Sequence, residues 1–175
     1  MIVLKTKRKL KITKIVFSKF QKGTSLIEIL VTLFIMAIGL LGLAAMQINS
    51  SKNINNSQFR SLAVSYAYDM AERMRSNPVG VSAGDYVALK TVSASAPTCM
   101  GSSCGTSDMA QLDSFEWAQQ LGASVLSGGL PSGEGIVSGS VGTGVYDIQV
   151  TWDEQDRDNT GGVISNSRLT LTIQL

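Results

Sequence analysis

Glu28 is the residue of this 175-residue chain whose position is hardest to explain by packing or solvation alone. It lies at the start of an apolar segment, and the 18 residues from Ile29 to Met46 carry no charge. Such a segment is long enough to cross a bilayer as a helix, and a carboxylate at its edge is costly unless a partner neutralises it. The position therefore predicts a carboxylate that is paired and kept for a function.

Other side chains that could do chemistry are few. The chain contains no histidine, which excludes Ser-His-Asp and Cys-His catalysis as well as histidine-ligated metal sites. An enzyme would need a carboxylate pair, and only the scattered acids of 108–116 and 153–158 are available. We therefore expect no catalytic residue, no cofactor and no metal site.

The acidic segment 153–162 offers one alternative to this expectation. Asp156-x-Asp158-x-Thr160-Gly161 is similar to the first half of a calcium loop, but Ser167 stands where the closing Glu is needed. The sequence predicts a solvated hairpin loop, with weak calcium binding as the alternative.

The residues around Glu28 also resemble a known processing signal. Lys22-Gly23-Thr24-Ser25-Leu26-Ile27-Glu28, followed by the apolar segment, is similar to the cleavage site of type IV prepilins and pseudopilins. The resemblance implies that a prepilin peptidase cuts between Gly23 and Thr24, and that the new amino terminus at Thr24 is methylated. It also implies that Glu28, the fifth residue after the cut, acts in filament assembly. Thr24 departs from the family pattern, in which the first residue is most often Phe.

An ordinary secretory signal is the alternative interpretation of the same segment. It would combine the basic start with an apolar region from Ile29 to about Leu41 and a small-residue cleavage site at Gly42-Leu43-Ala44. Glu28, and a glycine directly after Lys22, favour the prepilin signal.

The charge distribution predicts the orientation in a membrane. Residues 1–23 contain eight cations and no acid, so a product that begins at Thr24 keeps seven cations against all 13 acids, a net charge of −6. Basic flanks stay in the cytoplasm, so the residues after Met46 are expected on the opposite side of the membrane. We expect a single-pass inner-membrane protein with a periplasmic C-terminal domain, later part of a pilus on the cell surface. The acidic mature chain argues against nucleic-acid partners.

A long helix is predicted because residues 24–76 contain no proline. Residues 49–58 are rich in poor helix formers, and we expect them to be solvated or to face neighbouring subunits. Beyond them an apolar stripe at helical spacing predicts an amphipathic segment that ends at Asn77-Pro78, with Asp69 and Arg73 as an i,i+4 pair. The stripe consists of Phe59, Leu62, Ala63, Tyr66, Met70 and Met74.

Cys99 and Cys104 enclose four residues of a Gly- and Ser-rich region. An even cysteine pair in an oxidising compartment predicts a disulfide, whereas a redox site would favour Cys-x-x-Cys and a metal site would need further ligands nearby. Asp108 and Gln111 have the spacing of a capping box and predict the start of a short helix. Its expected apolar face is Leu112, Phe115, Ala118 and Leu121, with Gly122 as the stop.

Two features resemble minor pilins of the PilV kind. One is the stretch Asp69-Met70-Ala71-Glu72-Arg73-Met74-Arg75-Ser76-Asn77, and the other is the paired-cysteine loop followed by a short helix. Packing and capping account for the residues of 69–77, so we do not expect a binding site there.

The C-terminal part predicts a β-sheet. Apolar and polar residues alternate through 145–152 and 168–175, and 135–141 is a further plausible strand, with a weak one at 86–92. This pattern predicts an antiparallel meander with one buried face, against which the helix stripe packs.

Together these patterns predict an α+β, pilin-like fold in which a long N-terminal helix packs on a C-terminal antiparallel sheet. We expect a leader at 1–23, a transmembrane or filament-core half of the helix at 24–48, an amphipathic half at 49–77 and a periplasmic globular domain at 78–175.

The resemblance implies a non-enzymatic minor pilin that joins a priming or tip complex and promotes pilus assembly, twitching motility and adhesion. The implied partners are the prepilin peptidase, other minor pilins, the major pilin and the inner-membrane assembly platform. The alternatives are a minor pseudopilin of a type II secretion system and a pilus-borne adhesin or DNA-uptake receptor.

Overall fold

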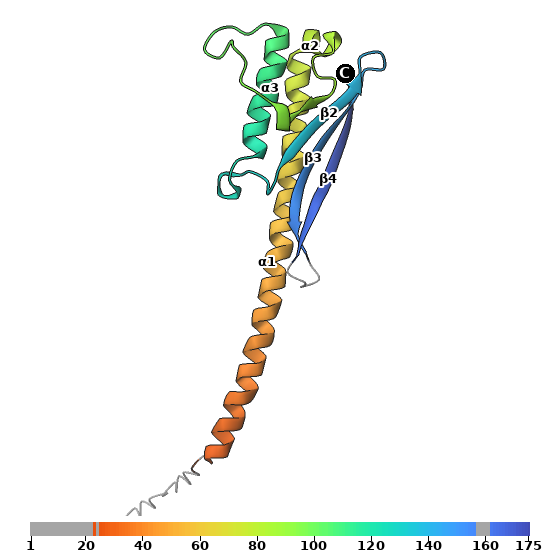
Figure 1. Cartoon of the computed structure of the whole chain (residues 1–175). Coiled ribbons are helices and arrows are strands. Elements are labelled where there is room, and N and C mark those ends of the chain that lie inside the picture. The colour runs from red at the N-terminus through yellow and green to blue at the C-terminus, as the bar shows by residue number, and fades with distance from the viewer. Residues whose placement is uncertain (1–22, 24, 157–161) are drawn as a thin grey trace, which may run out of the picture. The chain divides into compact units, whose positions relative to one another are not determined.

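The computed structural model describes residues 23, 25–156 and 162–175, and the chain divides after Leu43 into two compact units. The predicted leader up to Lys22, the predicted terminus Thr24, and Asp158, Thr160 and Gly161 of the calcium half-loop lie outside the described residues. In chain order the elements are α1 (Leu26–Ser76), α2 (Pro78–Ala83), β1 (Leu89–Lys90), the 3-10 turn η1 (Thr91–Ser93), α3 (Thr106–Leu121), the 3-10 turn η2 (Val125–Ser127), β2 (Glu134–Ser140), β3 (Val145–Gln155) and β4 (Val163–Gln174) (Figure 1).

The long helix α1 ends where the sequence predicts. Arg73 and Arg75 lie in its last turn, where cations interact favourably with the helix dipole. The Ser76 hydroxyl donates to the Arg73 carbonyl at 2.7 Å, and Pro78, which has no backbone N–H, follows two residues after Ser76. The chain then enters α2, whose N-cap is Asn77.

The polar stretch 49–58 is helical, and one of its residues contradicts the expectation of a solvated or partner-facing segment. Asn56 is only 1% exposed. Its amide donates to the Gln155 carbonyl at 2.9 Å and accepts the Gln155 N–H at 3.2 Å. The end of β3 covers Asn56, and the side chain satisfies both backbone groups of one β3 residue.

The four strands form one antiparallel sheet in the order β1-β2-β3-β4, which confirms the predicted meander. Val137 pairs with Ile148, and Ile148 with Leu171, across the three longer strands. The strand predicted at 86–92 is reduced to the two residues of β1. Ala88 before β1 has a positive φ of 64°, and the chain turns into η1 directly after β1, so regular extended structure cannot continue in either direction.

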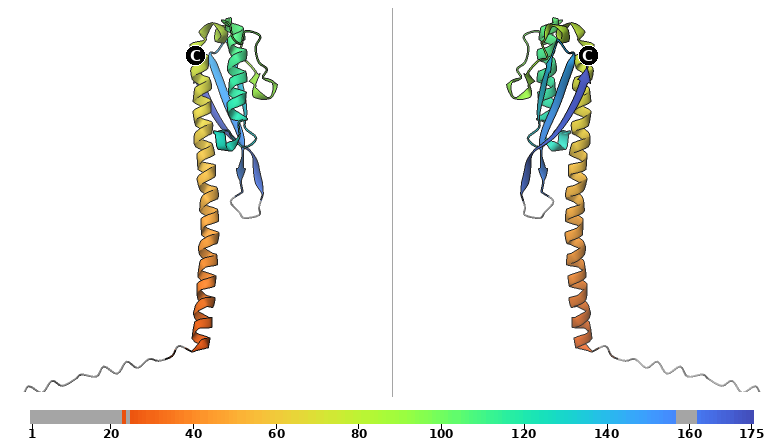
Figure 2. Two further views of the ribbon diagram at one scale, coloured as in Figure 1. Left: turned by 90° about the vertical axis from the view of Figure 1, so that its left-hand side faces the viewer. Right: turned by 90° about the vertical axis from the view of Figure 1, so that its right-hand side faces the viewer.

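The core lies between α1, α3 and one face of the sheet, and Figure 2 shows the strands alongside the part of α1 that belongs to the same unit. The predicted α1 stripe is confirmed, because four of its six residues are buried and Leu62 and Tyr66 pack against the core. The stripe also includes Ala67 and Ala71, which are fully buried. The sheet contributes Val137, Tyr146, Ile148, Val150, Trp152 and Ile173.

The predicted details of α3 are wrong in two respects. The helix begins at Thr106 with Gly105 as N-cap and no side-chain cap, and Gln111 bonds to Ser95 instead of closing a capping box with Asp108. The buried face is also rotated from the predicted one. It consists of Ala110, Asp113, Ser114, Trp117 and Leu121. The reason is that Trp117 enters the core and Asp113 meets buried polar partners from other elements.

Candidate processing and assembly site

The described part of the predicted cleavage site begins at Gly23, which lies outside α1 and is exposed. No atom stands within 4 Å of the place where a Cβ would be. The Ser25 carbonyl accepts the N–H groups of Glu28 at 2.9 Å and Ile29 at 3.3 Å, so helical hydrogen bonding starts only after the glycine. An open, non-helical glycine is accessible to a peptidase, while Thr24 on the other side of the predicted cut is outside the described residues.

Glu28 lies in the first turn of α1 and is exposed. A carboxylate at this position interacts favourably with the positive end of the helix dipole, and the described residues contain no ion-pair partner for it. The carboxylate is therefore available to a cation that lies elsewhere. The predicted pairing with an amine at Thr24 of a neighbouring subunit stays a prediction.

The helix surface around and after Glu28 is apolar on all sides. The large apolar side chains from Leu26 to Ile48 are each between 48% and 76% exposed. By length and composition this part of α1 could cross a membrane, and its place near the N-terminus fits the single-pass anchor typical of type IV pilins. A helix that is apolar all round requires lipid or other apolar helices around it.

Arg73 of α1 bonds to three carboxylates, and two of them belong to α3. Its Nε bonds to Asp69 at 2.9 Å, which is the predicted i,i+4 pair, and its Nη1 lies 3.2 Å from Asp113 and 2.7 Å from Glu116. Burial opposes the charge, but the hydrogen bonds from Glu116, Asp69 and Asp113 outweigh it and raise the pKa of Arg73. Arg73 therefore stays charged and links α1 to α3 through ion pairs.

Asn77 and Tyr86 complete this buried polar network. The Asn77 amide caps α2 by accepting the Gly80 N–H, and it donates to the Tyr86 hydroxyl at 3.2 Å and to the Thr106 carbonyl at 2.8 Å. Tyr86 in turn donates to Asp113 at 2.5 Å. Burial, together with the hydrogen bond to Asp113, raises the pKa of Tyr86. The polar groups of 69–77 thus serve packing and capping, as expected from the sequence.

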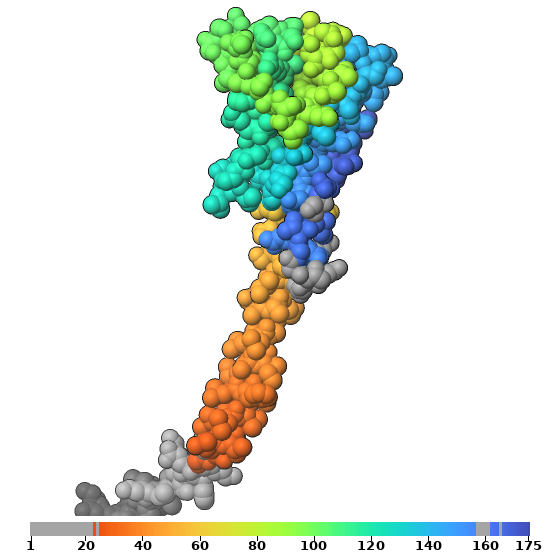
Figure 3. Space-filling view, in the orientation of Figure 1, coloured from red at the N-terminus to blue at the C-terminus, as the bar shows by residue number. Residues whose placement is uncertain are grey.

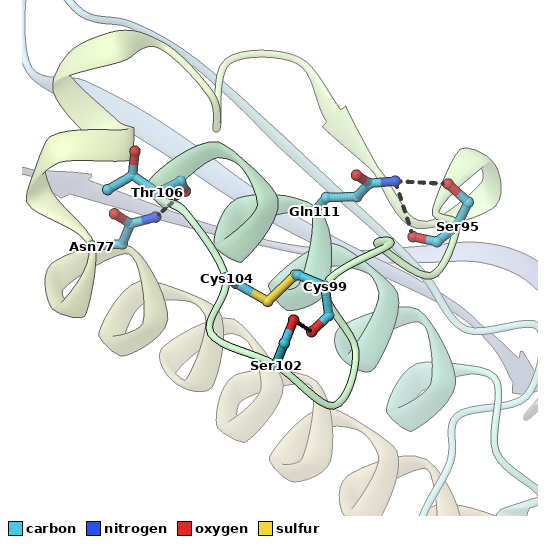
Figure 4. The surroundings of a disulfide bond; sticks show 7 residues. All are labelled: Asn77, Ser95, Cys99, Ser102, Cys104, Thr106 and Gln111. Carbon is cyan, nitrogen blue, oxygen red and sulfur yellow. Dashed lines mark hydrogen bonds between the residues drawn. A yellow bond between two sulfur atoms is a disulfide. The ribbon is translucent and has the colours of Figure 1, made fainter.

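Cys99 and Cys104 form the predicted disulfide, with their Cα atoms 5.2 Å apart (Figure 4). The Ser102 N–H and hydroxyl both donate to the Cys99 carbonyl, at 2.9 and 3.1 Å, and so order the loop between the two cysteines. The loop leads directly into α3, whose first residue, Thr106, is held by Asn77. The disulfide therefore fixes the entry to α3.

Sequence reasoning missed an ion pair between an exposed arginine and a buried glutamate at the far end of the sheet. Arg60 of α1 bonds to Glu154 of β3, which is 3% exposed, whereas segment 153–162 was expected to be a solvated loop. β3 continues to Gln155, with an irregularity between Trp152 and Glu154. Alternate residues of β3 point inward, among them Val150 and Trp152, and one further step of this alternation places Glu154 inward as well. The alternation was therefore the signal in the sequence from which the burial of Glu154 could have been predicted.

The start of α1 presents surface features that suit association with other molecules. In the parts of the chain that the structure describes, no three or more Cys, Asp or Glu side chains are placed to hold a metal ion together. The prominent surface features are an exposed carboxylate and an apolar helix, both presented by the start of α1. Together with a helix packed on an antiparallel sheet, these features define a pilin-like subunit.

Comparison with known families agrees with this class. Residues 18–44 match the family described as Prokaryotic N-terminal methylation motif, and residues 45–115 match the family described as Type IV pilin Tt1218. The two matches adjoin, and they support the type IV pilin superfamily and a structural pilin subunit rather than an enzyme. No curated protein and no solved structure matches this chain.

The matched ranges contain the motifs that resemble pilins in the sequence. The second match includes the stretch 69–77 and the cysteine pair, and it ends within α3, before the three longer strands of the sheet. The methylation motif implies processing by a prepilin peptidase and assembly with other pilins.

Proposed function

We propose that this chain is a minor pilin of the PilV kind, a subunit of a priming or tip complex that promotes assembly of a type IV pilus. Twitching motility and adhesion would depend on it indirectly. The observation that carries the proposal is that the methylation motif passes directly into the pilin match at residues 44 and 45, within one helix. The cysteine pair and the stretch 69–77 support the PilV kind by resemblance.

In this proposal each part of the chain has one task. Residues 1–23 are the leader that is removed, 24–48 lie in the membrane and then in the filament core, 49–77 form the amphipathic half of the helix, and 78–175 form the periplasmic domain. The subunit is held in the inner membrane before assembly. It meets the prepilin peptidase, the assembly platform, other minor pilins and the major pilin.

Glu28 would set the axial register in the filament. Cleavage after Gly23 creates an α-amine at Thr24, which is mostly cationic at neutral pH. An ammonium and a carboxylate are each costly in an apolar helix bundle and become tolerable when paired. The Thr24 amine of one subunit would therefore pair with Glu28 of its neighbour, and displaced registers would leave both charges unpaired.

A minor pseudopilin of a type II secretion system is the second candidate, because the amino-terminal motif is common to both kinds of subunit. Deleting the gene in the native host distinguishes the two. A minor pilin predicts fewer surface pili and loss of twitching with normal protein secretion, and a pseudopilin predicts the reverse.

Amino-terminal and intact-mass analysis of the protein from its native host tests the processing on which both candidates depend. A mature chain that starts at Thr24, with or without one added methyl group, supports the proposal. A chain that starts at Ala45 identifies an ordinary secreted protein and overturns it.

A further inference from the structure

β4 forms one edge of the sheet, and no described part of the chain pairs with its outer side. Figure 1 shows β4 as the outermost strand, and in Figure 3 its dark blue atoms lie at the border of the head. The register between β4 and β3 is regular through residues 168–174. An edge strand of this kind presents backbone N–H and C=O groups that a further strand can pair with.

The alternation of the antiparallel ladder shows which backbone groups of β4 face outward. The Leu175 N–H donates to the Gly144 carbonyl at 2.8 Å, on the side of β3. The N–H and C=O of one residue point to the same side of an antiparallel strand, and the side alternates from residue to residue. Ile173, Leu171 and Leu169 therefore bond to β3. The backbone groups of the residues between them point away from the sheet, and these residues are Arg168, Thr170, Thr172 and Gln174.

The opposite edge of the sheet is protected, in contrast to β4. β1 covers Ile136 and Val137 of β2. Next to them, the Thr91 hydroxyl accepts the Gly135 N–H at 2.8 Å and donates to the Gly135 carbonyl at 3.2 Å. Natural proteins commonly protect an edge with a very short strand, a lysine or a proline. β4 has twelve residues and contains neither lysine nor proline, so its edge is open to pairing.

A hollow of about 340 Å³ lies between α1 and this open edge. Its walls include Val64, which is 40% exposed, and the half-buried Leu169. Neighbouring strands lie about 4.8 Å apart, and successive side chains of a strand point to opposite faces. A strand added to β4 would therefore direct every second side chain toward α1, over the hollow. Apolar side chains at these positions would bury the apolar walls.

Arg168 adds a charge to the outer face of the open edge. It is exposed, lies opposite Thr151 in the register, and has no ion-pair partner among the described residues. An arginine can bind a carboxylate through two parallel hydrogen bonds. A cross-strand neighbour of opposite charge stabilises a sheet, and one of like charge destabilises it. The open edge therefore favours a strand with an acidic residue beside Arg168.

A second copy of the chain does not fit this edge through its own β4. Asn56 and Arg60 of α1 bond to the end of β3. Val81, which follows α1, bonds to Tyr146 near the start of β3. α1 therefore runs antiparallel to β3 and in the same direction as β4. Antiparallel pairing of two β4 strands would place the two α1 helices in opposite directions, and subunits anchored in one membrane cannot be joined in this way.

We propose that β4 accepts, antiparallel to itself, an extended segment of a different pilin subunit, which has apolar side chains toward α1 and a carboxylate beside Arg168. Addition of a strand to a sheet edge is a common way to bind an extended peptide segment. The added strand would bond to the outward backbone groups of 168–174, cover the hollow and continue the sheet into the next subunit. The proposal rests on the proposed function, because it requires neighbouring pilin subunits.

Hydrogen exchange resolved to single residues tests the strand addition. It compares the isolated full chain, as processed by the host, in detergent with the same chain in pili that are sheared from the native host and enriched through a tag. We expect the four outward amides to exchange roughly tenfold or more slowly in the pili. The amides of Leu169, Leu171 and Ile173 bond to β3 in both samples and serve as internal controls.

Two results would overturn the proposal and leave the proposed function standing. One is that the outward amides exchange equally fast in both samples. The other is that the isolated chain alone protects these amides as its concentration rises, because a second copy would then be the occupant. Absence of the chain from sheared pili would contradict the proposed function, and the strand addition would be refuted with it.

A proline at position 170 shows whether the outward backbone groups make the contact. Thr170→Pro removes one outward N–H and no bond to β3, and proline is tolerated on edge strands at such positions. Thr170→Ala is the matched control, since it removes the same hydroxyl and keeps the N–H. In competition with tagged wild type, we expect the share of Thr170→Pro in pili to be roughly tenfold lower than that of Thr170→Ala.

Thermal unfolding of the isolated variants shows whether both fold. Equal shares of the two folded variants in pili would overturn the proposal. If Thr170→Pro does not fold, the exchange measurement on the wild type decides alone.

Two substitutions of Arg168 test the expected carboxylate. Arg168→Glu would repel it, whereas Arg168→Gln only removes the attraction. We expect the share of Arg168→Glu in pili to be roughly threefold lower than that of Arg168→Gln, as for an exposed ion pair. Equal shares would overturn the proposed chemistry of the partner strand.

Discussion

Arg60 on α1 and Glu154 on β3 form a bidentate ion pair in which Nε lies 2.8 Å from Oε1 and Nη2 lies 3.1 Å from Oε2. The arginine side chain is 58% exposed and the glutamate side chain only 3%. The hydrogen bond and the charge of Glu154 together raise the pKa of Arg60. The pair brings an exposed cation to a carboxylate that the sheet has buried, and so joins the helix to the far end of β3.

We expect Arg60→Ala to lower the free energy of unfolding by about 1–2 kcal/mol, because a largely buried carboxylate loses a charged donor that is itself partly screened by water. Thermal unfolding of the full chain in detergent measures this. Arg75→Ala is the control, since the Arg75–Glu72 pair is exposed on both sides and should contribute no more than about 0.5 kcal/mol. Equal effects of the two substitutions would show that the burial of Glu154 does not matter.

Tyr86 should make the protein less stable in strong alkali. Its pKa is raised by burial and by the hydrogen bond to Asp113. An unfolded tyrosine ionises near pH 10. Above that pH the unfolded chain loses a proton that the folded chain retains, so the free energy of unfolding falls as pH rises, by at most about 1.4 kcal/mol per pH unit. Below pH 10 this contribution is fully present.

Tyr86→Phe removes the ionisable group and isolates this effect. We expect the variant to be about 1–2 kcal/mol less stable at neutral pH, because Asp113 and Asn77 lose the hydroxyl. Its stability should then decline less steeply than that of the wild type above pH 10. Denaturant titrations from pH 8 to 11 measure both quantities, with Tyr68→Phe at an exposed position as control. An unchanged slope in Tyr86→Phe would refute the assignment.

Gly135→Ala should disrupt the contact between β2 and α3. A Cβ at this position would stand 2.3 Å from two ring carbons of Trp117, whose Nε1–H donates to the Tyr66 carbonyl at 3.1 Å. The indole cannot move without losing that bond, so we expect a cost of about 2–3 kcal/mol, at the upper end for overpacked cores. Gly142→Ala, where the nearest atom is 3.8 Å away, should change stability by less than about 0.5 kcal/mol in the same melts.

Glu28→Gln should leave cleavage intact but impair entry into the filament. If an ammonium–carboxylate bond is lost at assembly, a cost of about 1.5–3 kcal/mol corresponds to roughly a tenfold to hundredfold smaller share of subunits. Competition with tagged wild type, quantified in sheared pili and in membranes, gives this ratio. Glu28→Asp keeps the charge and should be affected less. Equal incorporation of Glu28→Gln would refute the register hypothesis.

The sequence predicted those parts of the fold that local periodicity determines. The α1 stripe and the alternation in β3 are set by residues a few positions apart, and both lead to the observed core. The end of α1 followed from a proline and two cations within one turn. The predicted disulfide followed from two cysteines and their expected compartment.

The contacts that were missed connect residues distant in the sequence. Asn56 and Gln155 are 99 residues apart, and Arg60 and Glu154 are 94 apart, so neither local polarity nor local spacing reveals them. The face of α3 was misassigned for a related reason. Asp113 is polar by sequence but buried by partners from α1 and from the segment before β1. The predicted assembly role of Glu28 requires a cation from outside the described part of the chain, and it stays a prediction.

Asn56 and Arg60 lie one helical turn apart on α1, and they hold the adjacent residues Gln155 and Glu154 at the end of β3. At the other end of the same strand, the Tyr146 hydroxyl donates to the Val81 carbonyl in α2, at 3.2 Å. β3 is therefore fastened near both of its ends. A tensile load along the helix axis would act on these attachments in shear, so several bonds must fail together before the sheet separates from α1.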